Sequence, residues 1–214
     1  MSKVIAALSI SLDGFVAGPD PTLEDPLGTG GEQVHEWAFA AFAWREEHGL
    51  EGGQANADSE HIERLRARVG AGIMGRKMFS SGSGPWEDDP KNRGWWGEDP
   101  PFHHHVFVLT QHPRESLVMD GGTTFSFITD GIESALEQAR AAAGDKDVQI
   151  HGGGSAVSQY LAAGLLDEIT ITFAPVLLGS GTPLLQDVPP GRLERTRVTE
   201  SPSGAIHVEY TVRK

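Results

Sequence analysis

The feature that most limits the fold is a repeated alternation of short apolar runs and amphipathic runs along most of the chain. Apolar runs of strand length followed by runs of helix length are typical of strand–helix–strand units, and hence of a parallel sheet. The last two apolar runs instead follow each other across the turn Ser-Pro-Ser-Gly at 201–204, which predicts an antiparallel edge. The expected strands are 3–12, 71–75, 104–112, 123–129, 147–153, 166–175, 192–201 and 205–214, and the expected helices are 59–70, 130–144 and 155–165. The predicted fold class is therefore α/β, with a central, mostly parallel mixed sheet and flanking helices.

The chain of 214 residues is long enough for one large domain, and no repeat or domain linker is visible in it. We therefore expect a single domain over 1–214. Residues 19–59 have the composition of a loop around one helical stretch at 34–49. Long loops in compact domains are usually functional or disordered, so this segment is expected to be an insertion that covers a site.

Helix boundaries are expected from capping residues and apolar spacing. In the helix predicted at 59–70, Ser59 is the expected N-cap and Gly70 the expected end. Ile62 and Leu65 would lie on the apolar stripe of that helix. Asp130 is the expected N-cap of the helix at 130–144.

Charge and composition exclude several classes of protein. Seventeen Lys and Arg against 30 Asp and Glu give a net charge of −13, which argues against general binding to nucleic acid or to an anionic membrane. The absence of cysteine excludes disulfides, thiol catalysis and cysteine–zinc sites. No stretch reads as a signal peptide or a membrane span, so a cytoplasmic location is expected.

Three consecutive glycines, Gly152 to Gly154, separate an expected strand from an expected helix. Glycines at the carboxyl end of a strand, followed by a helix N-terminus, are suited to seating a phosphate or pyrophosphate. A tight turn without a ligand explains the same residues equally well. The spacing matches neither the dinucleotide-binding fingerprint nor a P-loop.

Two further strand ends carry groups that bind anions. Arg76 and Lys77 follow the apolar run that ends at Gly75, although cations are disfavoured at a helix N-terminus unless an anion is near. The stretch 106–114 ends in residues that together can hold a sugar phosphate: Thr110, Gln111, His112 and Arg114. Each cation alone is explained as a solvated surface residue, but three such strand ends together predict a dinucleotide site.

These stretches resemble the dihydrofolate-reductase-like superfamily, and most closely the reductase domain of riboflavin-biosynthesis deaminase/reductases. The matching stretches are VIAALSISLDGFVAG at 4–18, IMGRKMF at 73–79, VFVLTQHPR at 106–114, VQIHGGGSAVSQYL at 148–161 and LDEITITFAPVLLGSGTPLL at 166–185. The resemblance implies a reductase that uses NADPH, and a homodimer. It leaves out the insertion and the tryptophan-rich loop at 83–102.

The resemblance also assigns site residues. It places the nicotinamide ring against Ala7, Val16 and Ala17, and the phosphates and adenosine against Gly75, Arg76, Lys77 and Met78. The 2′-phosphate would be flanked by Leu109, Thr110, Gln111 and Arg114, and the pyrophosphate seated by Gly152, Gly153, Gly154, Ser155, Ala156 and Val157. Thr172 would lie on the strand behind the substrate.

The chemistry of the substrate side is less well defined. Folate reductases carry a buried carboxylate on the helix after the first loop, and none of the glutamates of the insertion is a clear counterpart, so folate reduction is not expected. Asp13 is the candidate catalytic residue, although an Asp-Gly pair is also a common turn. His35 and Trp37 could cover a substrate, or Trp37 could anchor the insertion.

Three adjacent histidines, 103–105, raise the question of a metal site. Neighbouring strand residues point to opposite faces, so only His103 and His105 could share an ion, and no metal is expected. The leading hypothesis is an NADPH-dependent reductase of a small heterocyclic or carbonyl substrate. The alternatives are a flavin- or nucleotide-binding protein of the same fold, and a dimeric module without catalysis.

Overall fold

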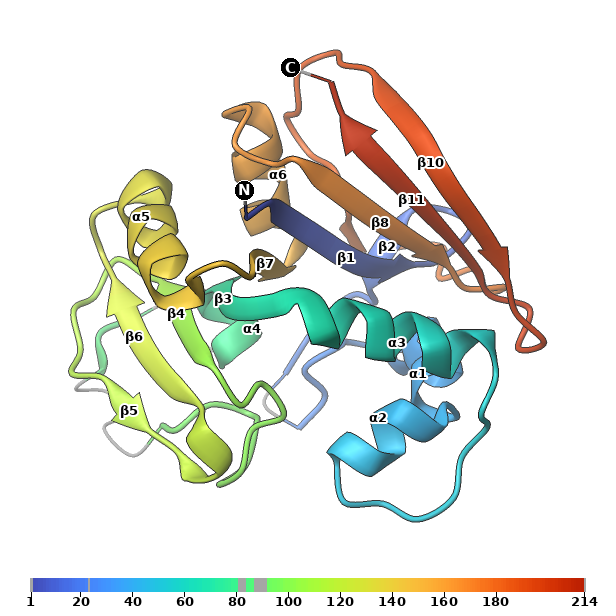
Figure 1. Ribbon diagram of the computed structural model, residues 1–214, viewed down its shortest axis with the longest axis horizontal. Coiled ribbons are helices and arrows are strands. Elements are labelled where there is room, and N and C mark those ends of the chain that lie inside the picture. The colour runs from blue at the N-terminus through green and yellow to red at the C-terminus, as the bar shows by residue number, and fades with distance from the viewer. Residues whose placement is uncertain (1, 23, 81–83, 87–91, 214) are drawn as a thin grey trace.

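A computed structural model describes residues 2–22, 24–80, 84–86 and 92–213 (Figure 1). A mixed sheet forms its centre, with strand order β10-β11-β8-β1-β7-β3-β4-β6-β5. The five pairings among β8, β1, β7, β3, β4 and β6 are all parallel, whereas β5 and the β10–β11 hairpin are added antiparallel. The structure thus confirms the predicted mostly parallel sheet with an antiparallel C-terminal edge.

Eight of the nine strands of this sheet are close to those expected from the apolar runs, and the short β5 was not predicted. They are β1 Val4–Ile10, β3 Val69–Gly75, β4 His105–Leu109, β5 Leu117–Val118, β6 Thr124–Ile128, β7 Asp147–Gly152, β8 Glu168–Phe173, β10 Leu193–Glu200 and β11 Ile206–Val212. A second, two-stranded sheet joins β2 Phe15–Ala17 to β9 Thr182–Pro183, and it was not predicted. Runs of two or three residues are too short to show a periodicity of their own.

Two apolar clusters cover the two faces of the sheet. On one face, α5 (Ile132–Ala143) and α6 (Gly154–Ala162) pack their alanine-rich sides on strands of the middle of the sheet, for example on Ile73 and Ile150. The second cluster lies around Phe79 of α4 (Arg76–Phe79), with Met74 and Trp86. Met74 and Ile73 are neighbours on β3, so they point to opposite faces. Both faces are therefore buried, as a parallel sheet requires.

The segment predicted as an insertion holds three short helical pieces instead of one helix. These are a 3-10 turn at Gly31–His35, α1 Glu36–Phe39 and α2 Phe42–Glu47. Ala41 breaks the run, because its backbone is extended and the Phe42 N–H bonds to the Gln54 carbonyl. The pieces lie beside α3 (Ala57–Arg68), apart from α5 and α6 (Figure 1).

Three predicted helix boundaries are wrong. The α3 helix begins two residues before Ser59, because the Asn56 side chain accepts the N–H groups of Asp58 and Ser59. It ends at Arg68, and Gly70 already belongs to β3. The N-cap of α5 is Gly131 instead of Asp130.

The buried face of α3 also differs from the apolar stripe expected from Ile62 and Leu65. Its fully buried residues are polar, namely Asp58, Ser59 and His61, while Ile62 and Leu65 are only partly buried. These polar side chains have partners on other elements, so tertiary contacts, and not apolar spacing, orient this helix.

Candidate functional site

The three strand ends that carry glycines and cations lie side by side. Strand β3 is paired with β7 on one side and β4 on the other, with Met74 opposite Gly152 and Gly75 opposite Leu109. The carboxyl ends of parallel strands meet at one edge of a sheet, where open α/β sheets bind their ligands. The structure therefore brings together the three stretches that the sequence offers as parts of one cofactor site.

The three glycines have different surroundings. Gly152 has a φ of 133°, and a Cβ there would lie 3.1 Å from the Met78 Sδ. A Cβ on Gly154 would lie 2.8 Å from the Pro183 carbonyl oxygen. A Cβ on Gly153 would meet nothing within 4 Å. The tight turn thus accounts for Gly152 and Gly154, while Gly153 borders open space.

The residues that open α6 contribute through the backbone more than through side chains. Ala156 and Val157 are buried in the core, and their N–H groups bond to the Gly153 carbonyl at 3.0 and 3.3 Å. The Gly154 and Ser155 N–H groups come earlier in the helix, where no acceptor within the helix is available. The side chain of Ser155 is exposed. An anion at this end would meet backbone donors and the positive end of the helix dipole.

Two of the predicted cations meet at one aromatic ring. The guanidinium carbon of Arg76 lies 3.3 Å from the centre of the Trp86 ring, and that of Arg114 lies 4.7 Å from it. The Trp86 side chain is 6% exposed, and its Nε1–H donates to the His112 carbonyl at 2.8 Å. Lys77 is exposed on α4 and is not part of this cluster.

The remaining predicted residues of the adenosine side lie around this cluster. The Thr110 hydroxyl accepts the His112 N–H at 3.2 Å and so shapes the segment after β4. Leu109 is partly buried against the core, and Gln111 is exposed. Met78 of α4 lies against Gly152. These predicted residues therefore lie near the carboxyl edge of the sheet.

The loop after β1 reaches the glycine turn through β9. Strand β2, which holds Val16 and Ala17, pairs with β9, and the Pro183 carbonyl of β9 lies against Gly154. Ala7 lies in the middle of β1 and is partly buried. The three residues predicted to face a nicotinamide are thereby placed on elements next to the candidate pyrophosphate turn.

Asp13 has a structural partner. Its carboxylate accepts the backbone N–H groups of Leu178 and Gly179 at 3.1 and 2.7 Å. The Ser11 hydroxyl and these N–H groups hold the pKa of the Asp13 carboxyl below its usual value. These contacts tie the loop after β1 to the loop after β8 and favour the turn interpretation; a catalytic role for Asp13 stays a prediction.

Thr172, predicted on the substrate side, belongs to a buried polar chain. Its hydroxyl lies 2.8 Å from the His207 Nδ1, and the His207 Nε2 lies 2.8 Å from the Asp58 carboxylate. The ring of His61 stacks on His207 with centroids 4.1 Å apart. Thr172, His207, Asp58 and His61 are each at most 2% exposed.

Trp37 joins the insertion to the buried polar chain formed by Thr172, His207, Asp58 and His61. Its Nε1–H donates to the Ser9 hydroxyl at 2.9 Å, and Ser9 is paired with Thr172 across β1 and β8. Its ring meets that of His207 edge-on, with centroids 4.8 Å apart. These contacts favour the interpretation of Trp37 as an anchor of the insertion.

His35 ends the 3-10 turn just before Trp37 and is partly buried. Burial lowers the pKa of its imidazole to about 4, so the ring is neutral at pH 7. Its ring lies 6.2 Å from that of Phe39, also within the insertion. Substrate contact by His35 stays a prediction.

Asp58 is the residue that sequence reasoning missed. It is a buried carboxylate on the helix that leads into β3, whereas the expected candidates for such a group were glutamates of the insertion. Burial raises the pKa of the Asp58 carboxyl, but the hydrogen bond from His207, together with the nearby Ser201 and Ser203 side chains, outweighs it and lowers the pKa overall. The available signal was the spacing of Asp58 and His61, three residues apart on one helix face. With Ser59 expected as the N-cap, Asp58 was expected to lie before the helix, so the spacing did not count as a helical one.

The three adjacent histidines have separate surroundings. The His103 ring contacts the Gly121 carbonyl, and the His105 ring contacts the Ser126 hydroxyl. His104 instead stacks with His151, at 5.7 Å between centroids. Within the described ranges, no three His, Cys, Asp or Glu side chains are grouped as metal ligands.

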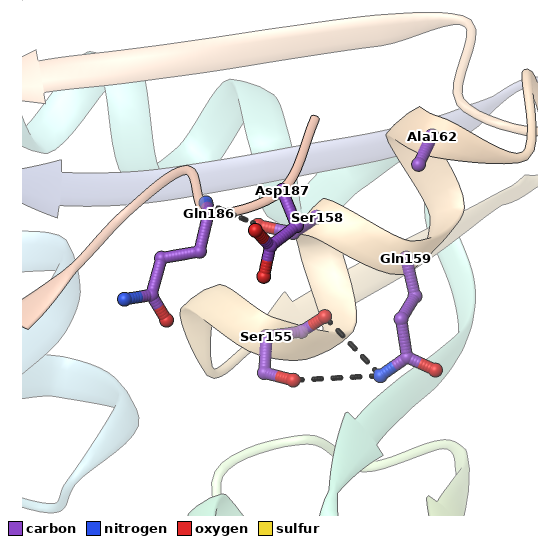
Figure 2. Close-up of a pocket in the computed structure, with 6 residues that line it drawn as sticks. All are labelled: Ser155, Ser158, Gln159, Ala162, Gln186 and Asp187. Atoms are coloured by element: carbon purple, nitrogen blue, oxygen red, sulfur yellow. Dashed lines mark hydrogen bonds between the residues drawn. The ribbon is translucent and has the colours of Figure 1, made fainter. Parts of the chain in front are cut away.

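A pocket lies between α6 and the segment that follows β9 (Figure 2). Its walls are Ser155, Ser158, Gln159, Ala162, Gln186 and Asp187. The Ser158 hydroxyl donates to the Leu184 carbonyl and accepts the Gln186 N–H. These two bonds attach the segment after β9 to α6. The one ionisable wall residue, Asp187, is acidic, which makes the pocket unsuited to a phosphate.

The charges at the opposite edge of the sheet are paired. Arg68 contacts the carboxylates of Asp147 and of Glu168, the latter at 2.8 Å, and Lys3 contacts Glu168. These residues stand at the amino ends of β7, β8 and β1. Ion pairs therefore close the edge of the sheet at which these strands begin.

Comparisons with known proteins agree with this arrangement. The chain is 28% identical over 212 residues to the uncharacterized protein YyaP of Bacillus subtilis, covering 97% of this chain and 94% of that one. A putative riboflavin biosynthesis protein from Shewanella has a similar structure, with a TM-score of 0.64 and 20% identity over 99% of both chains. A pyrimidine reductase-like protein from Corynebacterium diphtheriae gives a TM-score of 0.57 at 17% identity, over 100% of this chain and 92% of its own.

The fold is thus the dihydrofolate-reductase-like fold expected from the sequence motifs. No helix in the described ranges is long and apolar enough to cross a bilayer. The model of the RibD C-terminal domain matches residues 2–207, almost the whole chain. The protein therefore belongs to the RibD C-terminal domain family.

Proposed function

We propose that the protein is an NADPH-dependent reductase that transfers hydride to a small heterocyclic substrate of the pyrimidine type. Its family is one of reductase domains, which supports an oxidoreductase. The observation that carries the proposal is the register of β7, β3 and β4, which puts the glycine turn and the strand leading to Arg76 at one edge. A carbonyl substrate remains the nearest alternative acceptor.

The residues at this edge fit a pyrophosphate and a phosphate monoester. Open space beside Gly153 lets an anion approach the backbone, and the first N–H groups of α6 are donors there. Arg76 and Arg114 supply guanidinium groups, which suit phosphate better than ammonium groups do. When bound, NADPH supplies a hydride; the chain supplies position and electrostatics.

The substrate side would be held by the polar chain under the insertion. Thr172, whose buried hydroxyl is held by His207 and, behind it, Asp58, would support the strand behind the substrate. Trp37 would keep the insertion closed over β1 through its bond to Ser9. Asp13 is the candidate for proton transfer at the loop after β1.

The test is a titration of NADPH and NADH into the purified protein, followed by thermal unfolding. A ligand at a hundredfold excess over its Kd stabilises the native state by about 2.7 kcal/mol. We expect NADPH to raise the melting temperature, NADH to raise it much less, and Arg76→Ala to lose most of the NADPH effect. Arg140→Ala, an exposed arginine on α5, is the matched control and should respond as the wild type does.

Each other outcome points to a different protein. A folded wild type that responds to neither nucleotide contradicts the proposal. A visible absorption band of bound flavin in the purified protein supports the flavin-binding alternative. An NADPH response without oxidation by any acceptor in a broad panel supports a module without catalysis. Light scattering tests the expected homodimer, which a purely monomeric protein would disprove.

A further inference from the structure

Two imidazole nitrogens converge on one glycine of the central sheet. A Cβ on Gly72 of β3 would lie 2.3 Å from the His151 Nε2 and 3.2 Å from the His104 Nε2. The two nitrogens are therefore no farther apart than the sum of these distances, which is close enough for both to bond to neighbouring atoms of one small ligand. The rings are nearly parallel, with an angle of 12° between them and centroids 5.7 Å apart.

The backbone brings the two histidines together from strands on either side of β3. His104 immediately precedes β4, which pairs with β3 on one side. On the other side, the register of β7 against β3 shifts at His151, the extra residue between Ile150 and Gly152. Extra residues of this kind are over-represented beside active sites, where they redirect a side chain. The irregularity in β7 thus accounts for the position of the His151 ring over Gly72.

The nitrogens of this cluster lack partners within the chain. Among the residues that the structure describes, the Nε2 atoms of His104 and His151 and the Nε1 of Trp96 are buried and have no hydrogen-bond partner. Phe102 contacts all three rings, with centroid distances of 4.8 Å to His151, 4.9 Å to Trp96 and 6.2 Å to His104. Buried polar groups are normally paired, so three such nitrogens around one ring indicate a site for a hydrogen-bonding ligand.

The cluster is uncharged and lies close to the surface. Burial, the largest cause, lowers the pKa of His104 to about 4 and that of His151 to about 3. At pH 7 each Nε2 therefore either accepts or donates a hydrogen bond, according to the tautomer. The side chains of both histidines, of Trp96 and of Phe102 are partly exposed, although the three nitrogens are not. Such a pair of neutral rings suits an uncharged polar group better than a phosphate.

The two histidines lie on the side of the sheet where hydride transfer is proposed. Ala6 of β1 is opposite Ile150 of β7, so Ala7 and His151 follow them side by side on neighbouring strands. Ala6 and Ile150 belong to the core under α5 and α6, so Ala7 points to the other face, as Gly72 does. Ala7 is the predicted contact of the nicotinamide, and a hydride acceptor must lie directly beside that ring.

We propose that His104 and His151 are specificity-determining residues that bind the cyclic amide edge of the substrate heterocycle. One Nε2 accepts the ring N–H, and the other donates to the adjacent C=O. This inference rests on the proposed function and deepens it, because it names the groups that recognise the hydride acceptor. The competing explanation is that the two rings only fill the space over Gly72 and have water as the sole partner of their nitrogens.

The experiment records long-range ¹H–¹⁵N NMR spectra of the histidine side chains while uracil is added, with and without saturating NADPH. Uracil carries N–H and C=O groups side by side, whereas 1,3-dimethyluracil keeps the ring and the carbonyls but has no N–H. We expect uracil to shift the Nε2 resonances of His104 and His151, and 1,3-dimethyluracil to bind at least about fivefold more weakly. Resonances of both histidines that do not move with uracil overturn the inference and leave water as the partner.

Substitutions test the two rings separately. His104→Phe and His151→Phe keep an aromatic ring but remove the nitrogens, and each should weaken uracil binding about fivefold. His105→Phe is the matched control, because His105 is the next residue along the chain and its Nε2 already contacts the Ser126 hydroxyl at 2.8 Å. It should bind uracil as the wild type does. An equal loss in all three variants, or in none, contradicts the inference; the wild-type spectra decide the question if a variant fails to fold.

The two proposals fail in different ways. A protein that binds NADPH but shows no uracil shift at either histidine leaves the reductase proposal standing and overturns the role of His104 and His151. A folded protein in which uracil shifts both histidines, but which binds neither NADPH nor NADH, overturns the reductase proposal and supports the cyclic amide site. A folded protein that responds to none of these ligands overturns both.

Discussion

At the residue scale, neighbouring glycines in the turn after β7 serve different purposes. Gly154 is needed because the Pro183 and Leu184 carbonyls approach it closely, which joins β9 to the start of α6. Gly153 has no such neighbour, and its φ of −71° is open to any residue. Neither a close neighbour nor a positive φ therefore requires glycine at position 153.

This difference predicts opposite results for two alanine variants. Gly154→Ala should lower the free energy of unfolding by roughly 1–3 kcal/mol, since its Cβ would lie 2.8 Å from a carbonyl oxygen. Gly153→Ala should change the free energy of unfolding by less than roughly 0.5 kcal/mol. It should nevertheless weaken NADPH binding. Denaturant unfolding and nucleotide titration check both. A Gly153→Ala protein that binds NADPH normally would show that no pyrophosphate lies there.

At the scale of elements, α3 is placed by polar contacts at its start. Asn56 caps the helix, Ser59 accepts the Ala43 N–H from α2 at 2.9 Å, and Asp58 bonds to His207 of β11. One helix turn thus joins the insertion and the C-terminal hairpin. Further along the helix, Arg64 contacts Glu209 of the same strand at 2.8 Å.

The cap of α3 is tested by substitution at Asn56. Asn56→Ala should lower the free energy of unfolding by about 1 kcal/mol, whereas Asn56→Ser, which keeps a capping oxygen, should restore most of it. Denaturant unfolding at constant pH measures both variants. If Ser59 were the cap, as the sequence suggested, Asn56→Ala would have no effect.

At the scale of the whole molecule, burial keeps the imidazole rings of several histidines uncharged at neutral pH. Burial, the largest cause, lowers the pKa of His35 and His104 to about 4 and of His61 and His151 to about 3. The unfolded chain has its ordinary histidine pKa of 6.5. Between 6.5 and these lower values, the unfolded chain therefore binds more protons than the folded protein does.

Stability is accordingly expected to fall as the pH drops below 6.5. Each such histidine contributes a slope of about 1.4 kcal/mol per pH unit within its window, and the contribution is complete only above pH 6.5. Thermal unfolding at about pH 7.5 and about pH 5 measures the change. His151→Gln should reduce the slope. Equal stability at both pH values would contradict the prediction.

The order of strands and helices, the parallel sheet and its antiparallel edge followed from the sequence, because hydrophobic periodicity is a local property of each stretch. The same local patterns identified the glycine turn and Arg76, since strand ends in a parallel sheet must share one edge. The N-cap of α3 lies three residues before the expected Ser59, because several polar residues near the start of this helix compete for the same N–H groups.

Only the tertiary structure decided which distant side chains meet. The Asp58–His207 bond joins residues 149 positions apart, and Trp86 and His112 are 26 apart, so no local spacing reveals either contact. The pairing of β2 with β9 likewise depends on where two short segments are placed by their neighbours. Such contacts form because buried polar groups and charges need partners, and the fold determines which partners are within reach.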